Sequence, residues 1–287
     1  MLFQKKNLGF STNGPIPPEL RKIFLQIKLP SANSHKGQNG KLMIIGGSEL
    51  FHAASKWSLD IASRFVDMVF YSSVPSNNQL IQTIKANFWN GIVIPREKIE
   101  DYINEADCVL IGPGMERSPE TQELCNKLIK KFDKKKWVID AGALQMLDPS
   151  LVNEQQILTP HPRELSFLAQ RSNLSQQTIL NDFRATVLLK GPTDQIFFHK
   201  GLVRQQINIF GGNPGMTKGG TGDVLAGLIA GLYTNNEALT STILGSFVSK
   251  KAGDYLHSQV GPFFNASDMV QVIPSVLWKT LQEISNH

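Results

Sequence analysis

The sequence has few cysteines and no hydrophobic run long enough to cross a bilayer. Cys108 and Cys125 are the only two among 287 residues, and neither belongs to a CxxC or Cys/His pattern. This usage argues against a disulfide framework and a structural zinc site, and it predicts a reducing compartment. A membrane-spanning helix needs about 20 consecutive apolar residues, and a signal peptide needs an apolar core, and neither pattern is present. We therefore expect a cytoplasmic protein without a membrane partner.

Charge and motif content exclude further classes of protein. The formal net charge of +5 comes mainly from scattered Lys and Arg, and the densest run, at 130–136, is typical of a solvated helix end. No basic stripe is interleaved with aromatic residues, so we expect no nucleic-acid partner. The chain also lacks a GxxxxGK[ST] phosphate loop and a GxGxxG dinucleotide motif at the start of a βαβ unit. No repeat or linker divides it.

Short apolar runs alternate with longer helical ones along the chain. Continuous apolar strands separated by helices of about 10–15 residues predict a mostly parallel sheet covered on both faces, a doubly wound α/β sandwich. Residues 196–209 differ, because their polar alternation around HKG predicts an antiparallel hairpin. From about residue 223 onward the pattern is helical. The predicted parallel strands are 41–48, 68–74, 107–114, 136–142, 157–162 and 185–191.

The stretch NPGMTKGGTGDVLAGLIAGL, residues 213–232, places several glycines around one acid at the start of an apolar helix. Each interior glycine costs a helix about 1 kcal/mol relative to alanine, so a functional reason is expected. At a helix N-terminus the unpaired N–H groups and the helix dipole favour an anion, which glycine lets approach the backbone closely. Asp223 in this position fits a general base for phosphoryl transfer. A plain helix-start acid would explain Asp223 but not the glycines.

Small or polar residues, glycine and proline follow most of the predicted strands. In a doubly wound sheet, ligands bind at the carboxyl ends of the strands. Any one of these strand ends could be an ordinary turn, but together they predict the rim of a pocket. They are Gly46, Gly47, Ser48, Gly112, Pro113, Gly114, Asp140, Gly142, Thr159, Pro160, His161, Pro162, Lys190 and Gly191.

Seven motifs, taken in order, resemble the ADP-dependent NAD(P)H-hydrate dehydratase family of the ribokinase-like superfamily. The resemblance implies a ribokinase-like three-layer sandwich in one domain, 35–287, behind an N-terminal extension, 1–34. It also implies dehydration of (6S)-NADH hydrate and (6S)-NADPH hydrate through a phosphorylated intermediate, with ADP or ATP as co-substrate and Mg²⁺. The motifs are HKGQNGKLMIIGGS, IGPG, DAGAL, LTPHPREL, LLKG, NPGMTKGGTGDVLAGLIAGL and KAGDYLHSQVGPFFNASDMVQVIP.

The resemblance also implies roles for individual residues. Asp223 would deprotonate the substrate hydroxyl, while Gly220, Thr221 and Gly222 would stabilise the phosphoryl charge. Ala54, Gly114 and His161, together with Asp223, would contact the hydrated dinucleotide. The nucleotide would meet Lys190, Gly191, Pro192, Thr193, Asp194, Asn213 and Gly222. Magnesium would come with the nucleotide phosphates, since no acidic cluster in the sequence fixes its ligands.

Several positions depart from the motifs and leave the substrate preference open. Ala53 and Arg163 each stand where glycine is usual, and Gly142 stands where aspartate is usual. Glu116 lies in GPGMER, which replaces GPGLG, and Asp194 takes the place of a threonine. Simpler readings also stay open for two residues: His161 could rigidify a turn between prolines, and Lys190 could be a solvated strand end.

Two other functions compete with the dehydratase. A small-molecule alcohol kinase of the same superfamily would stop at the phosphorylated product, and a non-catalytic relative would bind nucleotide without turnover. The epimerase that accompanies the family is expected to be encoded separately, because only 34 residues precede His35. A homo-oligomer, possibly a tetramer, is expected from the resemblance.

Overall fold

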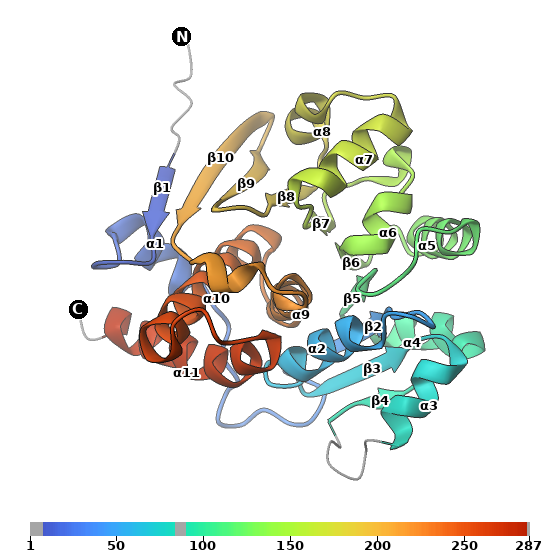
Figure 1. The fold of residues 1–287 in the computed structure, drawn as a ribbon, viewed down its shortest axis with the longest axis horizontal. Helices are drawn as coiled ribbons and strands as arrows, with labels where there is room; N and C mark the ends of the chain where they lie inside the picture. Colours follow the sequence, from blue (N-terminus) through green and yellow to red (C-terminus); the bar gives the residue numbers. More distant parts are fainter. Residues whose placement is uncertain (1–7, 84–89, 286–287) are drawn as a thin grey trace.

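A single sheet runs through the centre of the computed structural model, which describes residues 8–83 and 90–285 (Figure 1). Its strands are β1 Leu8–Ser11, β2 Lys41–Ile45, β3 Met68–Ser72, β4 Ile92–Val93, β5 Cys108–Ile111, β6 Lys136–Ile139, β7 Gln156–Leu158, β8 Thr186–Leu189, β9 Thr193–Lys200 and β10 Val203–Phe210. Within the described ranges the ten strands have the order β1-β10-β9-β8-β7-β6-β5-β2-β3-β4. Strands β8 through β4 in this order are all parallel, which confirms the predicted parallel sheet.

Helices cover both faces of the sheet because successive strand residues point in opposite directions. Leu42 and Ile44 of β2 join one apolar core, whereas Met43 and Ile45 join the other. The first core includes side chains of α1 Pro18–Phe24, α2 His52–Ala62, α9 Thr221–Tyr233, α10 Ala238–Val260 and α11 Ala266–Ser285. The second includes side chains of α4 Ile99–Glu105, α5 Pro119–Lys131, α6 Ala141–Met146, α7 Pro162–Ser172 and α8 Gln176–Asp182. Helix α3 spans Pro75–Thr83. The result is the predicted three-layer sandwich (Figure 1).

None of the helices in these described ranges is both long and apolar enough to span a membrane.

The predicted hairpin is present as β9 and β10, which pair antiparallel along their whole length. Its turn lies at Gly201 and Leu202 rather than across HKG, because His199 and Lys200 still pair with β10. The hairpin extends the parallel sheet beyond β8 and carries the chain to the glycine-rich stretch.

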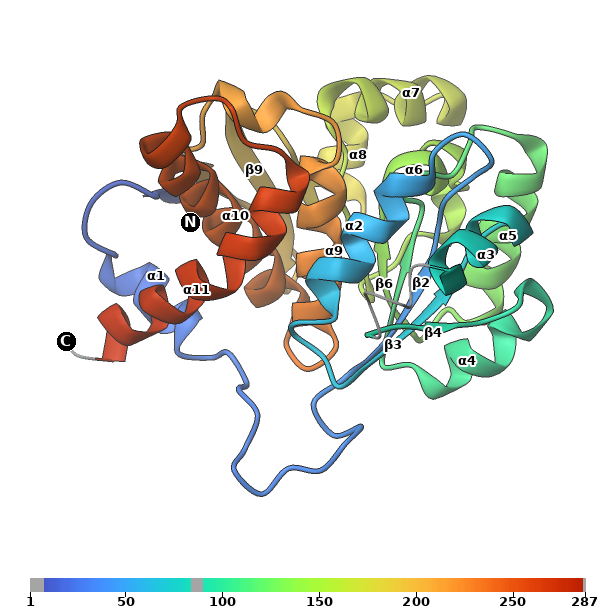
Figure 2. The ribbon, with the colours of Figure 1, turned by 60° about the horizontal axis from the view of Figure 1, so that its bottom comes forward.

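Helices α2 and α9 lie side by side on one face of the sheet (Figures 1 and 2). Ser58 of α2 donates a hydrogen bond through Oγ to the backbone carbonyl of Asp223, over 2.8 Å. Helix α9 also packs against β5 and β6. These contacts fix the first turn of α9 at the edge of the sheet where the parallel strands end.

The N-terminal segment forms part of this body. Strand β1 pairs in parallel with β10, and Thr12 Oγ1 donates to Asp254 of α10 over 2.7 Å. Phe24 of α1 is fully buried and meets Phe247 edge-on, with ring centroids 5.4 Å apart. The boundary at residue 35 stays a prediction, and residues 1–7 of the predicted extension lie outside the described residues. We propose that 8–34 and 35–287 fold as one unit.

Truncation of Phe24 tests this proposal. We expect Phe24→Ala to lower the free energy of unfolding by about 3–5 kcal/mol, because a buried aromatic side chain leaves a cavity. The adjacent Leu25 is 62% exposed, so Leu25→Ala is the matched control and should cost below about 1 kcal/mol. Chemical denaturation followed by circular dichroism measures both. Equal stability of the two variants would show that the segment is a separate appendage.

Candidate functional site

A cleft of about 650 Å³ opens at the carboxyl edge of the parallel strands. It brings together the four residues predicted to bind the dinucleotide: Ala54 of α2, Gly114 after β5, His161 before α7 and Asp223 of α9. Segments far apart in the sequence therefore converge on one hollow, as the rim of small and polar residues predicted.

The first turn of α9 has the geometry of an anion-binding helix N-terminus. Gly220 is its N-cap in a left-handed conformation with φ of +96°, where any side chain would also strike Trp57. A side chain at Gly219 would meet nothing within 4 Å, and one at Gly222 would meet only the Lys190 ammonium at 3.6 Å. The backbone here is consequently approachable, and the first amides of a helix have no intrahelical partner. The site lies where the dipole of a 13-residue helix favours negative charge.

Lys190 lies among acidic side chains rather than at a solvated strand end. Its Nζ donates to Asp140 Oδ1 over 2.8 Å and lies 3.9 Å from Glu164 Oε2. Asp140 also accepts from Thr159 Oγ1 over 2.8 Å. Burial by itself would lower the pKa of Lys190, but Asp140 and Glu164 outweigh it and raise the pKa above its ordinary value. Lys190 is therefore a fixed positive charge beside the first turn of α9.

Asp223 has an unusual proton affinity in this setting. Burial raises its pKa to about 7, the negative charge of Asp140 adds to the increase, and Lys190 offsets part of it. An aspartate normally titrates near pH 4. Asp223 can thus both release and accept a proton near neutral pH, which suits a general base.

His161 caps helix α7 and also lines the cleft, so its position fits both interpretations that the sequence left open. Its Nδ1 accepts hydrogen bonds from the backbone amides of Arg163 and Glu164, while Glu164 accepts from the His161 amide, so that a capping box begins α7. Burial, followed by the charge of Lys190, lowers the His161 pKa. With Nδ1 accepting, the neutral ring carries its proton on Nε2, which it can donate to a ligand.

The segment predicted to bind the nucleotide forms the turn between β8 and β9. Side chains of α10 hold this turn in place. Lys250 Nζ donates to the carbonyls of Gly191, Pro192 and Gly211 at 3.0–3.2 Å. Asp194 is buried: its Oδ1 accepts from the Gly191 amide, and its Oδ2 accepts from Ser246. We propose that Asp194 shapes this turn for the backbone of Gly191 to Thr193 rather than contacting a ligand itself.

The loop before α9 is held in a similar way. Asn213 Oδ1 accepts from the Gly215 amide over 3.0 Å, and Asp254 accepts from the amide of Gly212 and the side chain of Asn213. The Thr221 hydroxyl donates inward to the Met216 and Lys218 carbonyls. We therefore propose that Thr221 offers its backbone, not its hydroxyl, to a phosphoryl group.

Sequence reasoning assigned no role to several residues that complete the site. Asp140 and Glu164 share Lys190, Lys250 holds the β8–β9 turn, and Asp254 holds the loop before α9. A lysine within the buried apolar part of a helix was the available signal for Lys250. The pairing of Asp140 with Lys190 had no signal, because 50 residues separate them.

One departure from the family motif has a steric explanation. A Cβ at Gly142 would lie 2.0 Å from the Met115 carbonyl, so the usual aspartate does not fit beside the GPGMER loop.

No group of three or more His, Cys, Asp or Glu side chains in 8–83 and 90–285 lies in a metal-binding arrangement. The described chain does not fit a protein cage for Mg²⁺.

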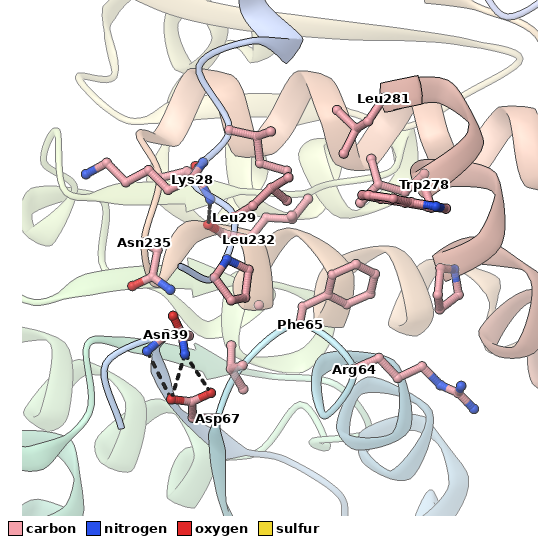
Figure 3. A pocket seen from close by; sticks show the side chains of 17 residues that line it. Lys28, Leu29, Asn39, Arg64, Phe65, Asp67, Leu232, Asn235, Trp278 and Leu281 are labelled. Atoms are coloured by element: carbon pink, nitrogen blue, oxygen red, sulfur yellow. Dashed lines mark hydrogen bonds between the residues drawn. The ribbon is translucent and has the colours of Figure 1, made fainter. Parts of the chain in front are cut away.

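A second hollow, of about 310 Å³, lies at the other end of α9 (Figure 3). Leu29, Phe65, Leu232 and Trp278 line it, and Asn39 and Asp67 hydrogen-bond to each other beside it. Its described lining contains none of the predicted site residues, so the first cleft is the candidate functional site.

The fold has close counterparts among solved structures. A ribokinase-like superfamily protein from Enterococcus faecalis matches 98% of this chain and 99% of its own, with a TM-score of 0.79 and 22% identity. An ADP/ATP-dependent NAD(P)H-hydrate dehydratase from Bacillus subtilis, co-crystallised with ATP and Mg²⁺, matches 90% of this chain and 96% of its own, with a TM-score of 0.72 and 18% identity. These matches confirm the ribokinase-like fold class.

Sequence similarity defines the family more narrowly. A profile of NAD(P)H-hydrate dehydratase matches residues 42–275, so the chain belongs to the NAD(P)H-hydrate dehydratase family. An ADP-dependent (S)-NAD(P)H-hydrate dehydratase from Nitrosopumilus maritimus is 31% identical over 86% of this chain and 91% of its own. A bifunctional NAD(P)H-hydrate repair enzyme from Methanocaldococcus jannaschii is 36% identical over 86% of this chain. The match spans 50% of that longer relative.

The raised pKa of Asp223 predicts a stability effect that needs no activity assay. Above pH 7 the folded chain must keep a partly buried aspartate ionised, whereas below pH 7 this group is neutral in the folded state. We expect Asp223→Asn to raise the free energy of unfolding by about 1–4 kcal/mol at pH 8. The difference should shrink as the pH falls toward 4, because the folded wild type then gains from its bound proton.

Urea unfolding at pH 5, 6, 7 and 8 measures this effect. Asp101→Asn, at an exposed aspartate of α4, is the control and should change stability by less than about 0.5 kcal/mol at each pH. A destabilised Asp223→Asn variant at pH 8 would contradict the raised pKa of Asp223.

Proposed function

We propose that this chain uses ADP to dehydrate (6S)-NADH hydrate and (6S)-NADPH hydrate, as its family membership indicates. One observation supports the proposal most strongly: Asp223, with a pKa of about 7, lies at the open first turn of α9 and inside the cleft with Ala54, Gly114 and His161. A base and an anion-binding backbone thus adjoin a hollow of dinucleotide size.

The chemistry follows from the weakness of hydroxide as a leaving group. Asp223 takes the proton of the C6 hydroxyl, whose oxygen then attacks the terminal phosphorus of ADP and releases AMP. Backbone amides at Gly220 to Gly222 and the charge of Lys190 stabilise the transferred phosphoryl group. The C6–O bond of the phosphorylated hydrate then breaks, phosphate leaves with the bonding electrons, and loss of a proton from the adjacent carbon restores the nicotinamide double bond.

The nucleotide is proposed to lie between the β8–β9 turn and the loop before α9. Lys190, Gly191, Pro192, Thr193, Asn213 and Gly222 supply its surroundings, and Asp194 supports them. ADP is preferred here because the relative from Nitrosopumilus maritimus is named ADP-dependent. Magnesium bound to the nucleotide phosphates would take its remaining ligands mainly from water, so no step above depends on a protein ligand to the ion.

Other features of the family stay predictions for this chain. They are a separately encoded epimerase, a homo-oligomer and a cytoplasmic location. Relatives such as that of Methanocaldococcus jannaschii are named bifunctional, so a fused epimerase is the alternative arrangement.

Absorbance at 340 nm tests the proposed reaction. Purified chain mixed with (6S)-NADH hydrate, Mg²⁺ and ADP should regenerate NADH. Asp223→Asn should lower kcat by about a thousandfold or more, since the base is lost while the cleft is kept. Accumulation of a phosphorylated hydrate without NADH would indicate a kinase, and nucleotide binding without either product would indicate a non-catalytic relative.

The pH profile tests the role of Lys190. For the free enzyme, kcat/KM should fall below pH about 7 as Asp223 becomes protonated. Because Lys190 lowers the pKa of Asp223, Lys190→Gln should move this acid limb to higher pH by about one unit, whatever it does to the maximal rate. An acid limb near pH 4 in the wild type would rule out Asp223 as the base described.

A further inference from the structure

Two arginines line the cleft at its exposed rim. Arg117 follows β5 and Arg163 lies in the first turn of α7, and both are solvent-exposed. Asp223, also part of the lining, is less exposed and lies on the buried helix α9. A dinucleotide whose nicotinamide reaches Asp223 therefore extends its adenosine half toward the rim.

One of the two arginines stacks on an aromatic side chain of the cleft. The Arg117 guanidinium lies over the Phe167 ring, 5.2 Å from its centroid. Phe167 also lines the cleft and lies four residues after Arg163, which puts both on the same face of α7. Arg117, Arg163 and Phe167 thus line the same cleft, a combination suited to a flat base with an attached anion.

Both charges are free to meet a ligand. Among the described ion pairs, none involves Arg117 or Arg163, although Glu116 and Glu164 also line the cleft. Glu164 is instead engaged with His161, Gln145 and Lys190.

We propose that Arg117 and Arg163 form a clamp for the 2′-phosphate of the adenosine, so that the chain prefers hydrated NADPH to hydrated NADH. A 2′-phosphate adds nearly two negative charges. One guanidinium group can donate two parallel hydrogen bonds to a phosphate. Arginine is the residue that dinucleotide sites use for this group. Both substrates share the pyrophosphate, which is in the middle of the dinucleotide. In an extended ligand it would lie deeper in the cleft than the adenosine at the rim. The inference rests on the proposed function for its substrates.

Binding of substrate fragments tests the clamp independently of catalysis. Calorimetric titration compares 2′-phospho-ADP-ribose with ADP-ribose for the wild type, Arg117→Gln, Arg163→Gln and the double variant. The wild type should bind the 2′-phosphorylated fragment at least about tenfold more tightly, and each single variant should lose most of that preference. Binding of ADP-ribose should change by less than about threefold.

Arg64→Gln is the matched control, because Arg64 lies beside the second hollow and donates to Gln271 (Figure 3). It should keep the wild-type preference. Equal binding of the two fragments by the wild type would overturn the proposal, and so would an equal loss of both in the arginine variants, which would assign the arginines to the pyrophosphate.

The 340 nm assay with both hydrates separates this proposal from the proposed function. A higher kcat/KM for NADPH hydrate that Arg163→Gln abolishes would support both. A preserved binding preference without turnover of either hydrate would overturn the dehydratase function and leave the clamp supported.

Discussion

The ion pair between the partly buried ammonium of Lys190 and the Asp140 carboxylate is the interaction on which the site depends. The ammonium also lies near Glu164 and faces the first turn of α9, where Asp223 lies. Without it, three carboxylates would share one partly buried space, and their mutual repulsion would oppose the packing of β6, α7 and α9 at this edge. The lysine therefore holds the sheet edge together and also sets the charge that an incoming phosphate meets.

The base at this edge is a compromise between opposing effects. Burial and Asp140 raise the proton affinity of Asp223, while Lys190 lowers it, and the resulting pKa of about 7 differs greatly from that of an exposed aspartate. An ionised aspartate held in this way works against stability. Such a cost is typical of functional sites, where activity and not stability decides which residue is kept.

The sequence predicted the elements with a clear apolar pattern, short parallel strands included, and missed the short elements of the N-terminal segment. Parallel strands, the β9–β10 hairpin and the helical C-terminal part follow from runs of apolar residues and from turn residues. Strand β1 has 4 residues and α1 has 7, and neither carries a clear pattern. Short elements form because a partner is available, so that Phe24 needs Phe247 and β1 needs β10. Local sequence patterns alone therefore led to the prediction that residues 1–34 are an extension outside the domain.

By itself, the sequence determined that a glycine-rich stretch begins a helix with one acid in its first turn. The anion site proposed there follows from the sequence alone, because backbone amides and the helix dipole are local properties. The sequence also placed Gly114 and His161 at strand ends, which a parallel sheet brings to one edge. Only the tertiary structure decided which charges act on Asp223 and that the Asp194 carboxylate faces inward. Electrostatic interactions depend on separation in space, and the fold brings together residues far apart along the chain.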